Sequence, residues 1–158
     1  MRYLAIDLGD KRTGLAVGDA DTRLVGPVGV IEVSIEHGAG EALLTAIVAA
    51  TAEHLGPPPK QPGGASHAEL VVGLPLNMDG SEGARARIVR EFAARIAART
   101  GYAVRFQDER LSTADADWSM ARRGLTHKQK KGRRDALAAA AILNDFLASI
   151  PHPDADHP

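Results

Sequence analysis

Alternating apolar and polar positions at the start of the chain predict two short strands. Residues 2–7 place leucine and isoleucine on one side of a strand and Asp7 on the other. Residues 13–19 alternate in the same way, and their small residues share one side: Gly14, Ala16 and Gly18. The connection between the two strands is of hairpin length, so we expect them to be antiparallel.

The rest of the chain alternates between strand and helix patterns. Further strands are expected within 25–33, at 68–73 and at 102–107. Helices are expected at 40–55, from about 82 to 100, from Ser112 or Thr113 to about 122, and from about 135 to 150. Three strands in succession, followed by strands that alternate with helices, predict an α/β fold with a mixed five-stranded sheet flanked by helices.

The strands at 2–7, 68–73 and 102–107 should be parallel. Their carboxyl ends then lie at one edge of the sheet, which is where α/β folds place ligands.

Length and composition fit one globular domain. The 158 residues are 44% hydrophobic and 25% charged, and we assign residues 1–150 to a single domain. Two segments offer no residues for a core. The Pro/Gly-rich stretch 56–67 is interpreted as a surface insertion, and residues 151–158 as a disordered tail.

Several classes of protein are excluded or disfavoured. The absence of cysteine excludes disulfides, thiolate zinc sites and cysteine nucleophiles. No apolar run approaches the ~18 residues of a membrane span, and the N-terminus lacks the apolar stretch of a signal peptide. We therefore expect a cytoplasmic protein without membrane contact. The net charge of -1 means that any surface for nucleic acid must be local.

Three carboxylates occupy positions that the predicted sheet can bring together. Asp7 lies near the end of the first strand, Glu109 just past the end of the last strand, and Asp135 at the expected start of the last helix. Clustered carboxylates repel, and protons or divalent cations must relieve that repulsion. Ligation by oxygen alone suits Mg²⁺ or Mn²⁺, and paired ions can orient a water and stabilise the leaving oxygen in phosphodiester cleavage.

Each carboxylate also has a purely structural explanation. Asp7 could initiate the turn that follows it. Glu109 could pair with Arg110 or Arg105 at the surface. Asp135 could be a first-turn residue favoured by the helix dipole.

A basic segment precedes the last of these carboxylates. Residues 122–134 contain lysines, arginines and His127 but no acidic residue, so a phosphate backbone held there would lie over the carboxylates. Such runs are often only a solvated face, and we interpret the arginines of the helix at 82–100 mainly in that way. The candidate nucleic-acid contacts are Arg12, Arg123, Lys128, Lys130, Lys131 and Arg134.

Four motifs in order resemble the YqgF family, also described as RuvX, whose members are described as pre-16S rRNA nucleases and as Holliday junction resolvase homologues. They lie at 5–19 (AIDLGDKRTGLAVGD), 72–83 (VGLPLNMDGSEG), 108–113 (DERLST) and 131–139 (KGRRDALAA). The resemblance spans the chain, although the insertion at 56–67 departs from the family's compact pattern. It implies an RNase H-like fold and a metal-dependent nuclease with Asp7, Glu109 and Asp135 as catalytic and metal-binding residues. The basic segment matches a mobile loop of the family.

The resemblance thus favours an Mg²⁺- or Mn²⁺-dependent endonuclease in the maturation of the 5′ end of 16S ribosomal RNA. Its partners would be the precursor RNA and the precursor of the small ribosomal subunit, and the protein would be a monomer or a weak homodimer. One alternative is a resolvase that cuts branched DNA with the same residues, and another is a non-catalytic RNA-binding assembly factor. A third is a nucleotide-binding module of the actin and sugar-kinase type, since Asp7-Leu-Gly9 and Thr13-Gly14 resemble its phosphate hairpin; such proteins generally use two lobes.

Overall fold

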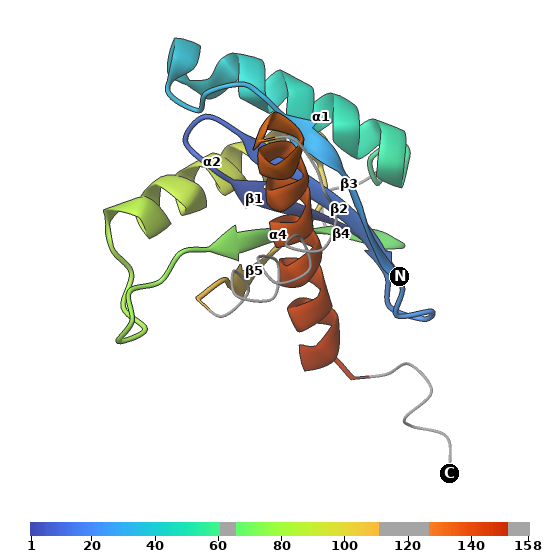
Figure 1. Ribbon diagram of the computed structural model, residues 1–158. Coiled ribbons are helices and arrows are strands. Elements are labelled where there is room, and N and C mark those ends of the chain that lie inside the picture. The colour runs from blue at the N-terminus through green and yellow to red at the C-terminus, as the bar shows by residue number, and fades with distance from the viewer. Residues whose placement is uncertain (61–65, 111–126, 152–158) are drawn as a thin grey trace.

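A five-stranded sheet with helices on both faces organises the protein (Figure 1). The computed structural model describes residues 1–60, 66–110 and 127–151. The strands are β1 (Arg2–Leu8), β2 (Thr13–Asp19), β3 (Val25–Ile31), β4 (Ala68–Leu74) and β5 (Val104–Asp108). The helices are α1 (Glu41–Leu55), α2 (Ala84–Thr100) and α4 (His127–Ser149), and a 3₁₀ turn (His37–Gly40) precedes α1.

The strand order β3-β2-β1-β4-β5 makes the sheet mixed. β1 pairs antiparallel with β2, which pairs antiparallel with β3, whereas β1, β4 and β5 are mutually parallel. The predicted hairpin and the predicted parallel set are therefore confirmed. The carboxyl ends of β1, β4 and β5 share one edge of the sheet.

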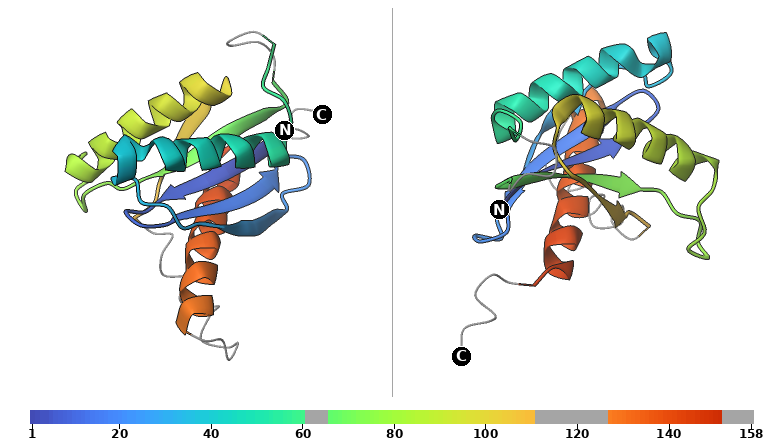
Figure 2. Two further views of the ribbon diagram at one scale, coloured as in Figure 1. Left: turned by 90° about the horizontal axis from the view of Figure 1, so that it is seen from above. Right: turned by 180° about the vertical axis from the view of Figure 1, so that it is seen from behind.

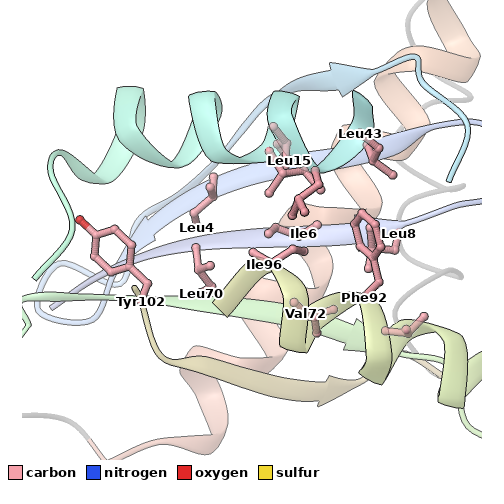
Figure 3. Close-up of a cluster of buried hydrophobic side chains, with 14 of the residues drawn as sticks. Leu4, Ile6, Leu8, Leu15, Leu43, Leu70, Val72, Phe92, Ile96 and Tyr102 are labelled. Carbon is pink, nitrogen blue, oxygen red and sulfur yellow. The ribbon is translucent and has the colours of Figure 1, made fainter. Parts of the chain in front are cut away.

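Alternation along the strands divides the core between the two faces of the sheet. Leu4, Ile6 and Leu8 pack with buried residues of α1 and α2 on one face (Figure 3). Small residues dominate the other face, where Ala5 and Ala16 lie against α4. Large apolar side chains thus hold two helices at a distance, and small ones let a single helix approach closely (Figure 2).

The last helix begins earlier than the sequence pattern indicated. α4 starts at His127, not at about 135, so residues 127–134 form roughly its first two turns. The interpretation of Asp135 as a first-turn residue is therefore wrong. The apolar period becomes visible only where the helix packs on the sheet, and its first buried apolar residue is Ala136. The preceding lysines and arginines are themselves good helix formers.

The other described boundaries agree with the predictions to within two residues. The helix predicted at 112–122 and the tail beyond Pro151 lie outside the described residues, as do positions 61–65 of the insertion. Among the helices that the structure does describe, none has the length and apolar character needed to cross a membrane.

Candidate active site

Asp7 and Glu109 meet at the carboxyl edge of the parallel strands. Asp7 lies one residue before the end of β1, opposite Gly14 of β2. Glu109 directly follows β5, and its backbone N–H donates to the carbonyl of Leu74 at the end of β4 (3.3 Å). The two side chains form a hydrogen bond with each other. Neither carboxylate can donate when ionised, so this contact requires one shared proton.

Burial and mutual repulsion favour that proton. Burial, then the charge of Asp7 and the hydrogen bond to it, raise the pKa of Glu109 to about 7. Burial also raises the pKa of Asp7, and the charge of Asp135 acts in the same direction. The two carboxyl groups therefore favour a singly protonated pair at neutral pH.

Close packing between α4 and β2 brings Asp135 to this pair. A Cβ atom on Gly14 would lie 1.9 Å from the carbonyl oxygen of Asp135, so only glycine permits this approach. The Oδ2 atom of Asp135 lies 3.8 Å from Nη1 of Arg12. The structure therefore brings together all three carboxylates singled out from the sequence, with Asp7 and Glu109 in contact and Asp135 close enough to act on Asp7 electrostatically.

The surface pairing considered for Glu109 is not formed. Arg110 pairs with Asp108, and Arg105 pairs with Glu69. Gly73 of β4 makes room for the Glu109 side chain, because a Cβ atom there would lie 2.8 Å from Oε2 of Glu109. Glu109 is therefore directed into the site by the surrounding packing.

The described part of the chain contains no group of three His, Cys, Asp or Glu side chains already arranged to hold one metal ion. The raised pKa of Glu109, which favours its neutral form, and the nearby guanidinium of Arg12 both reduce the repulsion among the carboxylates. The donor set still fits a hard divalent cation, since it consists of carboxylate oxygens, and burial together with mutual repulsion raises the pKa of two of these carboxyl groups. Asp7, Glu109 and Asp135 are the residues that could hold such an ion.

Arg12 carries an unused hydrogen-bond donor beside the carboxylates. Its Nη1 atom is buried and makes no hydrogen bond. Its guanidinium lies between Glu32 (Nε to Oε1, 3.9 Å) and Asp135, beyond hydrogen-bond distance of both. Buried donors are usually paired, so this one is available to an anionic oxygen that enters the site.

Arg85 is a neighbour of the site that the sequence did not single out. It donates to the carbonyl of Leu8 (Nη2 to O, 2.6 Å) and pairs with Asp10, which fixes the turn after Asp7. Its charge lowers the pKa of both Asp7 and Glu109, against the larger effect of burial. The sequence pattern did contain one indication that Arg85 lies near the site. Arg85 is the second residue of a helix that begins at the edge of the sheet where α/β folds bind ligands.

The α2 arginines lie mainly on a solvated face, as interpreted from the sequence, and several of them pair there with carboxylates. Besides Arg85, Arg90 pairs with Glu82. Arg95 and Arg99 both pair with Glu41 at the start of α1. These cations link elements of the fold, so they are not a free surface for phosphates.

The candidate nucleic-acid contacts near the last helix are only partly described. Lys128, Lys130 and Lys131 belong to the first turns of α4, the helix that carries Asp135. Arg134 directly precedes Asp135 and is exposed. Arg123 lies outside the described residues.

The raised pKa of Glu109 predicts a stability that falls with pH when a chelator is present. Between its ordinary value of 4.5 and about 7, the folded protein keeps a proton that the unfolded chain releases. The free energy of unfolding should therefore drop by about 1–3 kcal/mol from pH 5 to pH 8. Urea unfolding across that range measures it. Glu109→Gln should remove most of this dependence of the unfolding free energy on pH. If the wild type and Glu109→Gln lose stability equally between pH 5 and pH 8, the raised pKa does not belong to Glu109.

Comparisons with known proteins agree with the fold and show the family. The family pattern described as "RuvX: Holliday junction resolvase" matches residues 1–149. A protein of Anaeromyxobacter sp. (strain Fw109-5) is 44% identical over 147 residues, which are 93% of this chain and 96% of that protein. A Lactococcus lactis protein is 34% identical over 92% of this chain and 93% of its own length. Both are named "Putative pre-16S rRNA nuclease".

A solved structure supports the fold independently. The RuvC structure of Thermus thermophilus superposes with a TM-score of 0.50 at 16% identity, covering 94% of this chain and 95% of that one. At that identity the likeness shows the fold alone, which is RNase H-like. The family pattern covers all five strands of the sheet and the last helix, and the two relatives align over almost their full lengths. The chain belongs to the RuvX family.

Proposed function

We propose that this protein is a metal-dependent endonuclease that cleaves phosphodiester bonds in precursor 16S ribosomal RNA. The observation that carries the proposal is the meeting of Asp7, Glu109 and Asp135 at the carboxyl edge of the parallel strands. The family assignment and the RuvC fold support a hydrolase that acts on nucleic acid. The name of the relatives supports the RNA substrate and a role in ribosome biogenesis, and the protein would act in the cytoplasm.

The three carboxylates would hold Mg²⁺ or Mn²⁺, with Asp7 between Glu109 and Asp135. Such ions supply the orientation of a water and the stabilisation of the leaving oxygen. Glu109 would hold such an ion as a carboxylate, so the proton that its raised pKa favours would have to leave for the site to be loaded. Arg85 would keep Asp7 in place by holding the Leu8 carbonyl.

Arg12 would bind the substrate phosphate. Its buried Nη1 atom lacks an acceptor, and a phosphate oxygen next to the carboxylates would provide one. Lys128, Lys130, Lys131 and Arg134 would contact the backbone further along the strand, together with Arg123. Phosphate contacts carry no sequence information, so these residues would position the RNA without selecting the cleavage site.

Resolution of branched DNA is the second candidate. The family description and the RuvC fold favour it, and the same carboxylates would perform it. A four-way junction needs two symmetric cuts, so a resolvase should act as a dimer, whereas an RNA nuclease can act as a monomer. A non-catalytic assembly factor would bind precursor RNA without cutting it.

A cleavage assay with two substrates tests the proposal. An RNA that spans the 5′ end of 16S rRNA and a four-way DNA junction are incubated with the protein in Mg²⁺, in Mn²⁺ or in excess EDTA. We expect cleavage of the RNA in either metal and none in EDTA. Undiminished cleavage in EDTA would overturn the metal-dependent mechanism. Cutting of the junction alone would identify a resolvase, and binding of RNA without cleavage would identify an assembly factor.

A further inference from the structure

Met78 is presented to solvent at the tip of the loop between β4 and α2. It is 88% exposed, more than any other large hydrophobic residue in the described parts of the chain. Single exposed apolar side chains are common and need no explanation by themselves. The structure of the loop and its place beside the active site make this one informative.

Backbone hydrogen bonds close the tip of the loop into a turn. The backbone N–H of Asn77 donates to the Ser81 carbonyl (2.9 Å), and that of Gly80 donates to the Asn77 carbonyl (2.8 Å). Leu76 and Glu82 pair as a short antiparallel bridge below them. Gly80 takes a φ of +86°, which favours glycine and completes the turn. A tip fixed in this way loses little conformational entropy when it binds a partner.

The loop is joined to the strand end that carries Glu109. Arg110 donates through Nη1 to the carbonyl of Met78 (3.2 Å). The same guanidinium is held by both oxygens of Asp108 (Nε to Oδ2, 2.8 Å). Figures 1 and 2 show the loop extending past the sheet beside the end of β5. A nucleotide close to the carboxylates would therefore have Met78 within the same surface.

The charges at the tip disfavour phosphate as its partner. Asp79 is exposed, and hydrogen bonds from Ser81 lower the pKa of its carboxyl, so it stays ionised at neutral pH. The guanidinium of Arg110 is already engaged by Asp108. The tip offers an apolar thioether beside a negative charge, which repels the backbone but tolerates an uncharged base. Methionine makes favourable contacts with aromatic rings and can act as a wedge between bases.

We propose that Met78 packs against an unstacked nucleobase next to the phosphodiester bond that is cleaved. This inference rests on the proposed function, since it assumes that the carboxylates act on nucleic acid. It adds a contact with a base at a site whose other candidate contacts are to phosphate. The loop would favour substrates that are single-stranded or distorted at this position, because a base stacked within a regular helix cannot reach the side chain.

Fluorescence of 2-aminopurine tests the contact. RNA oligonucleotides that carry 2-aminopurine at successive positions around the cleaved bond are titrated with the Asp7→Asn protein, which is expected to bind without cutting. We expect the fluorescence to change at one position. Met78→Ala in that background should remove most of that change and weaken binding by about 5-fold or more, the usual loss when a base loses its stacking partner. The slope of log affinity against log salt should stay the same, because no phosphate contact is lost.

Leu24→Ala is the matched control. Leu24 is also strongly exposed (73%), but it lies in the turn between β2 and β3, at the opposite end of β1. Leu24→Ala should leave the affinity for RNA and the 2-aminopurine fluorescence unchanged. Neither Leu24→Ala nor Met78→Ala should alter the urea unfolding midpoint. If RNA binds but Met78→Ala behaves like Leu24→Ala, the inference is wrong and the proposed function stands. Protein that binds neither RNA nor branched DNA would overturn both.

Discussion

Asp7→Asn is expected to reduce single-turnover cleavage by about a thousandfold or more, as is usual for a group at the centre of a catalytic set. Asp7 contacts Glu109, and the charge of Asp135 raises the pKa of Asp7. Asp7 is therefore the residue of the site that interacts with both of the other carboxylates. Asparagine keeps the shape of the side chain and an oxygen acceptor for the Glu109 proton. It removes the charge that a divalent cation would require.

The same substitution should not destabilise the protein in the presence of a chelator. Burial raises the pKa of Asp7, so the ionised form is strained in the folded state. We expect an unfolding midpoint in urea that is unchanged or slightly higher than in the wild type. RNA should still bind, because the basic residues are intact.

Asp21→Asn serves as a control for this experiment. Asp21 is exposed and pairs with the N-terminal amine, which lies at the amino end of β1, away from the carboxylates. The Asp21→Asn protein should cleave RNA at the wild-type rate. A folded Asp7→Asn protein that cleaves normally would show that Asp7 is structural. Asp135→Asn should follow the pattern of Asp7→Asn with a smaller loss of activity, since Asp7 is the residue affected by both of the other carboxylates.

Gly14→Ala is expected to lower both stability and activity. The new Cβ atom would lie 1.9 Å from the Asp135 carbonyl oxygen and 2.5 Å from its carbon. Both contacts are with backbone, so α4 would have to move away from β2 and would carry Asp135 with it. Overpacking of this kind costs about 1–3 kcal/mol. A shift of about 1 Å in a catalytic group can cost on the order of a hundredfold in rate.

The matched control lies on the neighbouring strand. Gly29 of β3 has nothing within 4 Å of an added Cβ atom. Gly29→Ala should therefore retain the wild-type rate and nearly the wild-type unfolding midpoint. Urea unfolding and cleavage are measured for both variants. Equal behaviour of the two alanines would mean that β2 and α4 are not as closely packed as the structure shows.

Much of the sheet follows from local pattern. Alternation in β1 assigned Leu4 and Ile6 to one face and Asp7 to the other, and the structure confirms this division. The short turn after Asp7 required an antiparallel partner, and the later helices required parallel crossovers. With the strand directions known, the ends of β1 and β5 had to share an edge, which placed Asp7 and Glu109 near each other.

The limits of local pattern show at the start of α4. The apolar period of a helix reports the residues that touch the core, so it revealed the helix from about Asp135 onward. The preceding turns carry lysine, arginine and glycine, and nothing in their period separates a helix from a polar loop. Only the folded structure shows that Asp135 lies well inside a helix that starts at His127.

The sequence by itself determined the strands, their directions and the edge at which the acidic residues gather. The tertiary structure alone decided the contacts within the site: the proton shared by Asp7 and Glu109, the unpaired donor of Arg12, and the reach of Arg85 to the Leu8 carbonyl. The physical reason is the separation along the sequence of the residues that interact. Strand and helix patterns reflect neighbours a few residues apart, whereas Asp7 and Glu109 are far apart along the chain. Their separation in space depends on how closely whole elements pack, which small residues such as Gly14 and Gly73 permit only in the assembled fold.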